Sequence, residues 1–319
     1  MLHYKRQLDE KNEASKSTSF DFAGSILISL GLLLAVYGAS EAPLIGWLSI
    51  QTLPFLIGGL ALLVVYVIWA LKRSNPAVNI KLLRHAQTAL ALGISILASI
   101  VLFGVLFLLP IFMESFQGIS SFETGLALLP QGLVTGVGTI IGTKLPSKRG
   151  TKFTVSLGMG ILAATTALLL VLNTSTPVWM TATILSGRGL ALGLTIQPLL
   201  LATVGSLSGS EVSDGNTLFN ILERLGGTIG VSLLSTVFTL REQFRIGQVL
   251  ALLGINPSQI SGGLGQSASS SFLASLPLSI RAELGNAAVS GFHDTIILMS
   301  VVSLIGLILA IFIKDRRKD

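Results

Sequence analysis

Three ionisable residues, Arg188, Glu223 and Arg224, lie inside long apolar stretches of the sequence. A charged side chain deep in a lipid bilayer is costly unless it is paired or in contact with water. Because Glu223 and Arg224 are adjacent, helical geometry points them about 100° apart, so they cannot both face one partner. One simple arrangement pairs Glu223 with Arg188 of a neighbouring helix. Such a pair would either fix helix register or belong to a proton- or substrate-linked gate, and the sequence leaves both open.

Four further polar residues lie near the ends of apolar stretches. Glu114 is either a proton-binding carboxylate or a solvated one, and Glu123 is expected to cap a helix or lie on the surface. Histidine titrates near physiological pH, so His293 and Asp294 could relay protons, although a solvated interfacial pair is the preferred interpretation. The side chains that could line an apolar cavity, or simply pack, are Phe103, Phe107, Phe112, Met113 and Phe116.

Glycines are closely spaced within several apolar stretches, and Gly138 and Gly142 are two of them. Small residues let helix backbones approach closely inside a membrane, where lipid offers no hydrophobic drive. These positions would serve static packing or form surfaces on which helices slide, and neither interpretation excludes the other. The candidate packing or hinge residues are Gly132, Gly136, Gly187, Gly189, Gly193, Pro198, Gly226, Gly227 and Gly230.

Composition narrows the class of protein. Of 319 residues, 51% are hydrophobic and only 11% are charged, against about 25% in a typical soluble domain. The formal net charge of +6 comes from short clusters between apolar runs, which is not a nucleic-acid-binding pattern. There is no cysteine, the three histidines are far apart, and hydrolase and nucleotide-binding motifs are missing. The sequence therefore predicts a membrane protein without enzymatic activity, metal site or cofactor.

A helix that spans a bilayer needs roughly 20 mostly apolar residues. Eight stretches qualify, and their continuous apolar character predicts helices rather than barrel strands. We therefore expect an all-α integral membrane protein. The predicted spans are 22–40, 53–71, 89–113, 124–143, 153–172, 178–203, 217–240 and 295–313.

Eight spans place both termini on one side of the membrane, and that side would carry sixteen Lys and Arg residues against three on the other. This bias predicts cytoplasmic termini and a multi-pass protein of the cell (inner) membrane. Residues 1–19 carry both charge signs and do not read as a signal peptide. The long connection 241–294, which is Gly/Ser-rich, is then expected outside the cell.

Several motifs together resemble the major facilitator superfamily, specifically its 14-helix drug/proton antiporters of the EmrB/QacA type. The segments 20–24 and 46–49 are similar to the seventh helix and the loop after it, and 125–130 is similar to the tenth. The segment 187–193, with Pro198, resembles the twelfth helix, and 220–231 resembles the thirteenth. The order and spacing of these motifs extend over nearly the whole chain.

The resemblance implies that the eight spans correspond to helices seven to fourteen. Residues 20–86 would form a linker hairpin, 87–314 the C-terminal six-helix bundle and 315–319 a cytoplasmic tail. The N-terminal six-helix half would be missing, so the chain would be a fragment or one part of a split transporter. Its expected partners are a small amphipathic organic substrate, protons, the lipid bilayer and a separate N-terminal half, but no nucleic acid.

The segment 143–150 resembles the C-half copy of a cytoplasmic loop motif of this family. Ser147 stands where the motif has an aspartate, so a latch made by that aspartate would be absent or replaced. The basic residues Lys144, Lys148 and Arg149 remain, as does Gly150. They are consistent with a tight turn close to anionic lipid headgroups.

The resemblance implies proton-coupled export by alternating access, in which protonation of an intramembrane carboxylate shifts the equilibrium between two states. Glu223 is the first candidate for that carboxylate, with Arg188 and Arg224 tuning its charge state and Glu114 as a further candidate. Two alternatives stay open: an uptake transporter for a nutrient or siderophore, and a non-transporting membrane fragment.

Overall fold

The computed structural model describes residues 21–73, 75–205, 207, 209, 211–252 and 277–315. Their regular structure is entirely helical. The helices are α2 (Phe22–Ile45), α3 (Leu53–Lys72), the short 3-10 helix η1 (Ile80–Arg84), α4 (Ala86–Ser115), α5 (Ser121–Arg149), α6 (Thr151–Leu168), its 3-10 continuation η2 (Leu169–Val171), α7 (Val178–Gly205), α8 (Glu211–Leu252) and α10 (Leu278–Ala310).

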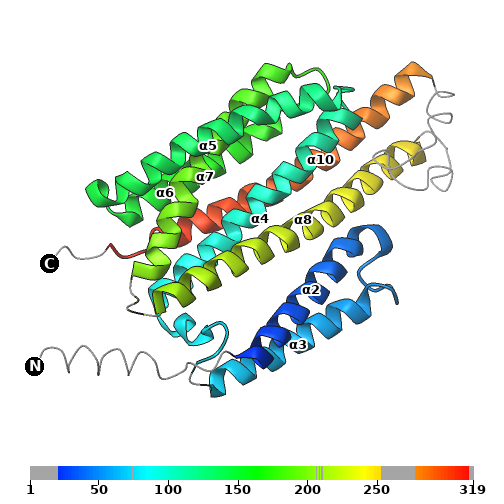
Figure 1. Cartoon of the computed structure of the whole chain (residues 1–319). Coiled ribbons are helices and arrows are strands. Elements are labelled where there is room, and N and C mark those ends of the chain that lie inside the picture. The colour runs from blue at the N-terminus through cyan, green and yellow to red at the C-terminus, as the bar shows by residue number, and fades with distance from the viewer. Residues whose placement is uncertain are drawn as a thin grey trace, which may run out of the picture.

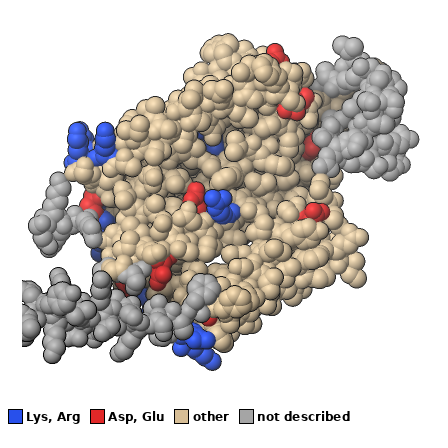
Figure 2. All heavy atoms as spheres, in the orientation of Figure 1, with Lys and Arg blue, Asp and Glu red and all other residues tan. Residues whose placement is uncertain are grey.

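Eight of these helices are long and apolar enough to cross a membrane, which confirms the eight predicted spans. On the face drawn in Figure 2, acidic and basic side chains occur only in small groups and the rest of the surface is neither. Side chains such as Leu33 and Leu60 are more than 60% exposed. Such an apolar exterior is stable in lipid and not in water.

Local chemistry fixes several helix ends. Ser120 and Glu123 form a reciprocal capping box at the start of α5, so the expected capping role of Glu123 is confirmed. Gly150, at φ +88°, is the single residue between α5 and α6. The predicted loop 143–150 is therefore wrong, because its residues up to Arg149 form the last turns of α5. Lys148 and Arg149 stabilise that helix end by complementing its dipole.

The helices α8 and α10 extend far beyond the stretches that the apolar pattern predicts. The expected outer connection 241–294 is helical at both ends, since α8 continues to Leu252 and α10 begins at Leu278. The polar residues that interrupt the apolar run do not interrupt the helices. Arg245 of α8 and Asp294 of α10 pair at 3.0 Å, so the charges that suggested a loop join two helices instead.

The helices form a six-helix unit, α4 to α10, with a hairpin of α2 and α3 along one side (Figure 1). α2 packs most closely on α3 and also contacts α8, while α5 and α7 form the most intimate pair of the larger unit. The interior core is built by residues from α4, α6, α7, α8 and α10, such as Leu92, Met159 and Phe292.

Glycines set the closest helix contacts, but at positions partly different from those expected. A Cβ on Gly142 of α5 would collide with the backbone of Gly193 of α7, so these two helices touch through their main chains. Gly230 of α8 packs in the same way against α4. Gly132 and Gly136 are exposed, and a Cβ on either would have no neighbour within 4 Å, so their expected packing is not found in the described residues.

Candidate functional site

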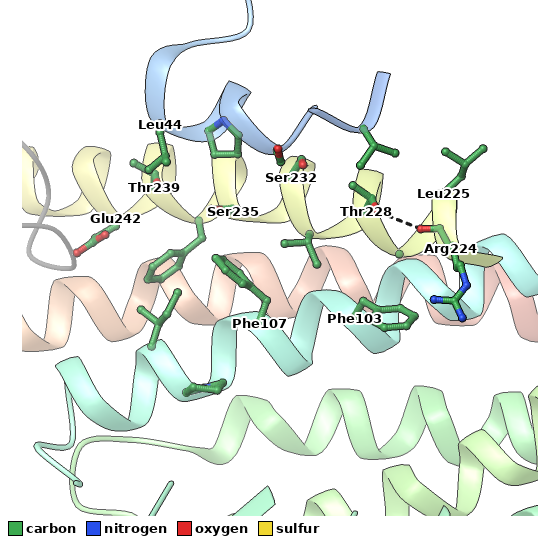
Figure 3. A pocket seen from close by; sticks show the side chains of 18 of the residues that line it. Leu44, Phe103, Phe107, Arg224, Leu225, Thr228, Ser232, Ser235, Thr239 and Glu242 are labelled. Carbon is green, nitrogen blue, oxygen red and sulfur yellow. Dashed lines mark hydrogen bonds between the residues drawn. The ribbon is translucent and has the colours of Figure 1, made fainter. Parts of the chain in front are cut away.

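A cavity of about 1080 Å³ lies between the hairpin helix α2 and the two helices α4 and α8 (Figure 3). Its size is at the upper end of what proteins use for small organic ligands. All three walls belong to this chain. The cavity is the strongest candidate for a binding site in the described residues.

The α8 wall of the cavity carries a stripe of polar residues among apolar ones. Its polar residues recur every three or four positions, which puts them on one face of the helix, directed toward α2 and α4 in Figure 3. Sequence reasoning missed this stripe, although its three- and four-residue spacing was a readable signal. The stripe consists of Arg224, Thr228, Ser232, Ser235, Thr239 and Glu242.

The other two walls are mostly apolar. Phe103 and Phe107 contribute the aromatic surface of α4. For these two residues, the prediction that they line an apolar cavity is confirmed. Phe112 and Met113, expected with them, are instead fully buried in the core, where Phe112 stacks on Phe292 with ring centroids 4.3 Å apart. The α2 wall is formed by Leu32, Val36, Ser40, Pro43 and Leu44.

Charged groups lie at the ends of the cavity. Figure 3 shows Arg224 beside Phe103 at one end and Glu242 at the other. Glu114, at the end of α4, is exposed and also lines the cavity. Glu223, next to Arg224, is half-buried and is not among the lining residues. A polar stripe facing apolar walls, with charges at the ends, suits an amphipathic molecule.

Arg188 is buried in the core, and its expected pairing with Glu223 is wrong. Its exposed fraction is 1%, and its guanidinium donates to the Thr166 hydroxyl of α6 at 2.6 Å and to the Val101 carbonyl of α4 at 3.1 Å. Nothing in the sequence specified which helices would surround α7. Arg188 therefore joins α4, α6 and α7 and makes no ion pair among the described residues.

The expected solvated pair of His293 and Asp294 is split between two partners. Asp294 accepts two-pronged hydrogen bonds from Arg245 of α8 at 3.0–3.1 Å. The Nε2 atom of His293 lies 2.8 Å from the carbonyl oxygen of Leu172, at the end of η2. Both residues therefore hold α10 against its neighbours.

A carboxylate sits at the α5–α6 junction although Ser147 replaces the aspartate of the loop motif. Asp315, just after α10, accepts a hydrogen bond from the backbone N–H of Lys152 at 2.9 Å. A side chain at Gly150 would collide with this carboxylate. The neighbouring residue Lys314 donates its backbone N–H to Gln87 of α4 at 2.8 Å. The basic residues Lys144, Lys148 and Arg149 are exposed around the junction.

A buried carboxylate, Asp21, precedes α2. It accepts hydrogen bonds from the backbone N–H groups of Gly24 (3.0 Å) and Ala77 (3.2 Å) and from the indole of Trp69 (3.2 Å). Burial raises the pKa of Asp21, but these hydrogen bonds and the charge of Arg73 outweigh it, so the net pKa is lowered from 3.8. Asp21 therefore stays ionised and ties both hairpin helices together.

Among the described residues, no cluster of three His, Cys, Asp or Glu could hold a metal ion. Eight helices are long and apolar enough to cross a membrane, and three of them line this cavity, so the chain is a multi-pass membrane protein. The Major Facilitator Superfamily profile matches residues 16–231, and the chain belongs to that family.

Two curated relatives illustrate the relationship. The chain is similar to an uncharacterized MFS-type transporter, YhcA, of Bacillus subtilis, with 27% identity over 312 residues that cover 94% of this chain and 58% of the relative. It is 28% identical over 245 residues to a multidrug resistance protein B homolog of Mycobacterium tuberculosis, covering 76% of this chain and 45% of the relative. The chain thus spans about half the length of the curated relatives it matches.

A solved structure has a similar fold. It is a bacterial homologue of the human lysosomal transporter Spinster in an inward-facing, occupied conformation. The TM-score is 0.53 at 18% identity, and the match covers 89% of this chain and 64% of the other. At this identity the likeness establishes the major-facilitator fold alone.

Proposed function

We propose that this chain is part of a proton-coupled antiporter that exports small amphipathic organic compounds from the cell across the inner membrane. The cavity between α2, α4 and α8 is its substrate site. Relatives named as multidrug resistance protein and multidrug transporter support an export role. Both termini are cytoplasmic in this proposal, which rests on the distribution of Lys and Arg.

The observation that carries the proposal is the contrast between the cavity walls. The hydroxyls of α8 offer hydrogen bonds to the polar part of a substrate, and Phe103 and Phe107 offer an aromatic surface to its apolar part. Specific recognition of one compound would need several convergent polar groups, whereas a stripe of hydroxyls accepts many orientations. Such a site suits a class of compounds more than a single metabolite.

The proton enters the proposal through Glu223. This half-buried carboxylate lies beside Arg224, which reaches the end of the cavity. Protonation of Glu223 would release Arg224 from its neighbouring charge and so change the charge that a substrate meets. Glu114 is the second candidate, because it lines the cavity directly. Arg188 has a supporting role, since it joins three helices of the six-helix unit.

Alternating access requires a second moving body. In the proposal, the hairpin 20–86 and the six-helix domain 87–314 work against a separate N-terminal six-helix half. The length of the relatives, about twice that of the matched region, supports this arrangement.

Proteoliposomes test the function. The chain is reconstituted alone and together with a six-helix N-terminal half, and rhodamine 6G flux is measured with and without a pH gradient. We expect gradient-dependent flux with the second half present and its loss in Glu223→Gln. Glu123→Gln, which retains the capping geometry, is the matched control and should transport normally. If flux through the parent protein does not depend on the pH gradient, antiport is contradicted. If flux through Glu223→Gln depends on the gradient as in the parent, the proposed role of Glu223 is contradicted.

A further inference from the structure

The two helices of the α2–α3 hairpin are packed backbone to backbone. We therefore expect the hairpin to move as one body. A Cβ on Gly59 of α3 would collide with the main chain of Ala35 on α2. Gly31 and Gly38 also lie close to α3, where a Cβ would come within 3.0 Å of Leu63 and Leu56. Such contacts between small residues are the usual basis of tight helix pairs in membranes.

Hydrogen bonds hold the hairpin together at the end where its chain continues into the six-helix unit. There Asp21 binds the first turn of α2, the indole of Trp69 at the end of α3 and the backbone of Ala77. The Tyr66 hydroxyl both donates to the carbonyl of Val78 (2.8 Å) and accepts from its N–H (2.7 Å). The segment holding Ala77 and Val78 leads through η1 into α4, so this end of the hairpin is continuous with the six-helix unit.

Packing at the same end is also close. Leu27 and Ile28, near the beginning of α2, pack against the main hydrophobic cluster, which includes Tyr66 and Ala70 of α3 as well as residues of the six-helix unit. Farther along α2, Leu32, Val36 and Leu44 line the cavity. The cavity therefore lies between α2 and the six-helix unit along the second half of the helix.

At the opposite end, a single side-chain hydrogen bond among the described residues joins the hairpin to α8. The 24 residues of α2 carry the chain about 36 Å from Asp21 to the α2–α3 turn. In that turn, the indole of Trp47 donates to the Thr236 hydroxyl of α8 at 2.8 Å. Among the described residues, this is the side-chain hydrogen bond that fastens the turn to the six-helix unit. Gly46, at φ +103°, ends α2 directly before it.

We propose that the hairpin is a hinged wall of the cavity, which pivots at the Asp21 end and opens at the Trp47 end. Opening admits an amphipathic molecule sideways from the lipid bilayer. The inference rests on the proposed function, in which the cavity takes such molecules. The outer surface of the hairpin carries exposed apolar residues, among them Leu33 (61%) and Leu60 (63%), so the opening faces acyl chains and not water.

Cysteine labelling tests this entrance, and the chain offers a clean background because it has no native cysteine. Ser235→Cys places a thiol on the cavity wall behind the hairpin. In lipid nanodiscs, we expect bilayer-dissolved pyrene maleimide to modify it faster than a sulfonated, water-soluble maleimide. Trp47→Phe and Thr236→Val should each raise the pyrene maleimide rate roughly two- to tenfold, the factor that one such hydrogen bond is worth.

The two substitutions remove the same hydrogen bond, so the double variant should react no faster than the faster single variant. Thr217→Val is the matched control: it removes a comparable hydroxyl on α8, which bonds only to the carbonyl of Ser213, and should leave the rate unchanged. Equal rates in all variants overturn the inference. Faster modification by the sulfonated reagent also overturns it, because the cavity would then open to water.

A distance measurement covers the case in which labelling is slow. Spin labels on Leu48→Cys and Leu240→Cys report the turn against α8, and labels on Leu71→Cys and Leu83→Cys report the pivot. Trp47→Phe should add a longer distance to the first pair and leave the second unchanged. If the distance distributions of both pairs were the same in Trp47→Phe as in the parent, the hinge would be contradicted. Neither measurement uses transport, so a failed side entrance and a failed antiport mechanism give different results.

Discussion

The backbone N–H of Lys152 donates to the carboxylate of Asp315, so a residue that follows the last helix caps the beginning of α6. The first N–H groups of a helix have no partner within the helix, and a carboxylate there also complements the helix dipole. Gly150 leaves the space that this carboxylate occupies.

Loss of this cap should destabilise the protein. We expect Asp315→Ala to lower the free energy of unfolding by about 0.5–2 kcal/mol. Gly150→Ala should have a similar or larger effect, because the added methyl group meets the carboxylate and its φ of +88° is unfavourable for alanine. Thermal unfolding in detergent measures both. Asp315→Asn keeps an acceptor and should lose less, and equal stability of Asp315→Ala and parent would show that the cap is unimportant.

Replacement of the buried Arg188, in contrast, is not expected to destabilise the protein. Without Arg188, the Thr166 hydroxyl would still have a hydrogen-bond partner, since it also donates to the Leu162 carbonyl. Arg188 has no ion pair among the described residues, and its Nε has no hydrogen-bond partner. Replacing a desolvated charge with an apolar side chain of similar length is often neutral or stabilising.

We therefore expect Arg188→Met to unfold at the same temperature as the parent or higher, while transport falls. Arg188→Ala should be less stable than Arg188→Met by about 2–5 kcal/mol, because it leaves a cavity. Thermal unfolding and flux in the same preparations check this. A large loss of stability in Arg188→Met would mean that the guanidinium holds the three helices together energetically.

Glycine substitutions separate packing positions from free ones. Gly142→Ala and Gly193→Ala should each destabilise the α5–α7 pair by more than about 2 kcal/mol, since the added methyl groups meet backbone that cannot yield. Gly132→Ala and Gly136→Ala lie on α5 too, but have open space around them. They should be neutral or stabilising by up to about 1 kcal/mol through helix propensity. Denaturant unfolding of the four variants gives a direct comparison.

Acid should loosen the pivot of the hairpin. The folded-state pKa of Asp21 is lowered, so its ionised form contributes stability above the ordinary pKa of 3.8, and this contribution is lost as the pH falls through the lower folded value. At pH 7, Asp21→Asn should weaken the hairpin by about 1.5–3 kcal/mol, the value of hydrogen bonds to a charged group. Below pH 4 the difference from the parent should shrink. Proteolysis of the hairpin across pH measures it, and Glu41→Gln on the same helix is the control.

Dye binding tests the aromatic wall of the cavity. Phe103→Leu and Phe107→Leu should weaken rhodamine 6G binding by roughly two- to tenfold each, because an aromatic contact is worth about 0.5–1.5 kcal/mol beyond its area. Phe122→Leu is the matched control, since Phe122 is 76% exposed on α5 and does not line the cavity. Fluorescence titration in nanodiscs gives the dissociation constants. Equal affinities in all three variants would place the dye elsewhere.

The sequence predicted what depends on local physics. Eight apolar stretches are long enough to be recognised without neighbours, and the capping role of Glu123 depends only on residues three positions away. Which helices face each other is a property of the whole bundle. For that reason the sequence indicates the wrong partner for Arg188, and it does not distinguish the glycines of α5 that pack, Gly138 and Gly142, from Gly132 and Gly136, which do not.

The cavity was only half predictable. The aromatic residues of α4 stood out by type, but Phe112 and Phe107 differ only in which side of the helix they occupy. The hydroxyls of α8 did not stand out, because serine and threonine are tolerated in membrane helices and each is weakly polar. Asp315 lies more than 160 residues from its hydrogen-bond partner, a distance over which no local pattern operates.

The single-residue joint between α5 and α6 limits how the six-helix unit can deform. With only Gly150 between helices of 29 and 18 residues, the adjoining ends cannot part, and one pair of backbone torsions sets the angle between them. When α5 tilts relative to α6, it therefore rotates about Gly150. Its largest displacement then falls at the far end of α5, near Ser121, on the opposite side of the membrane from the joint.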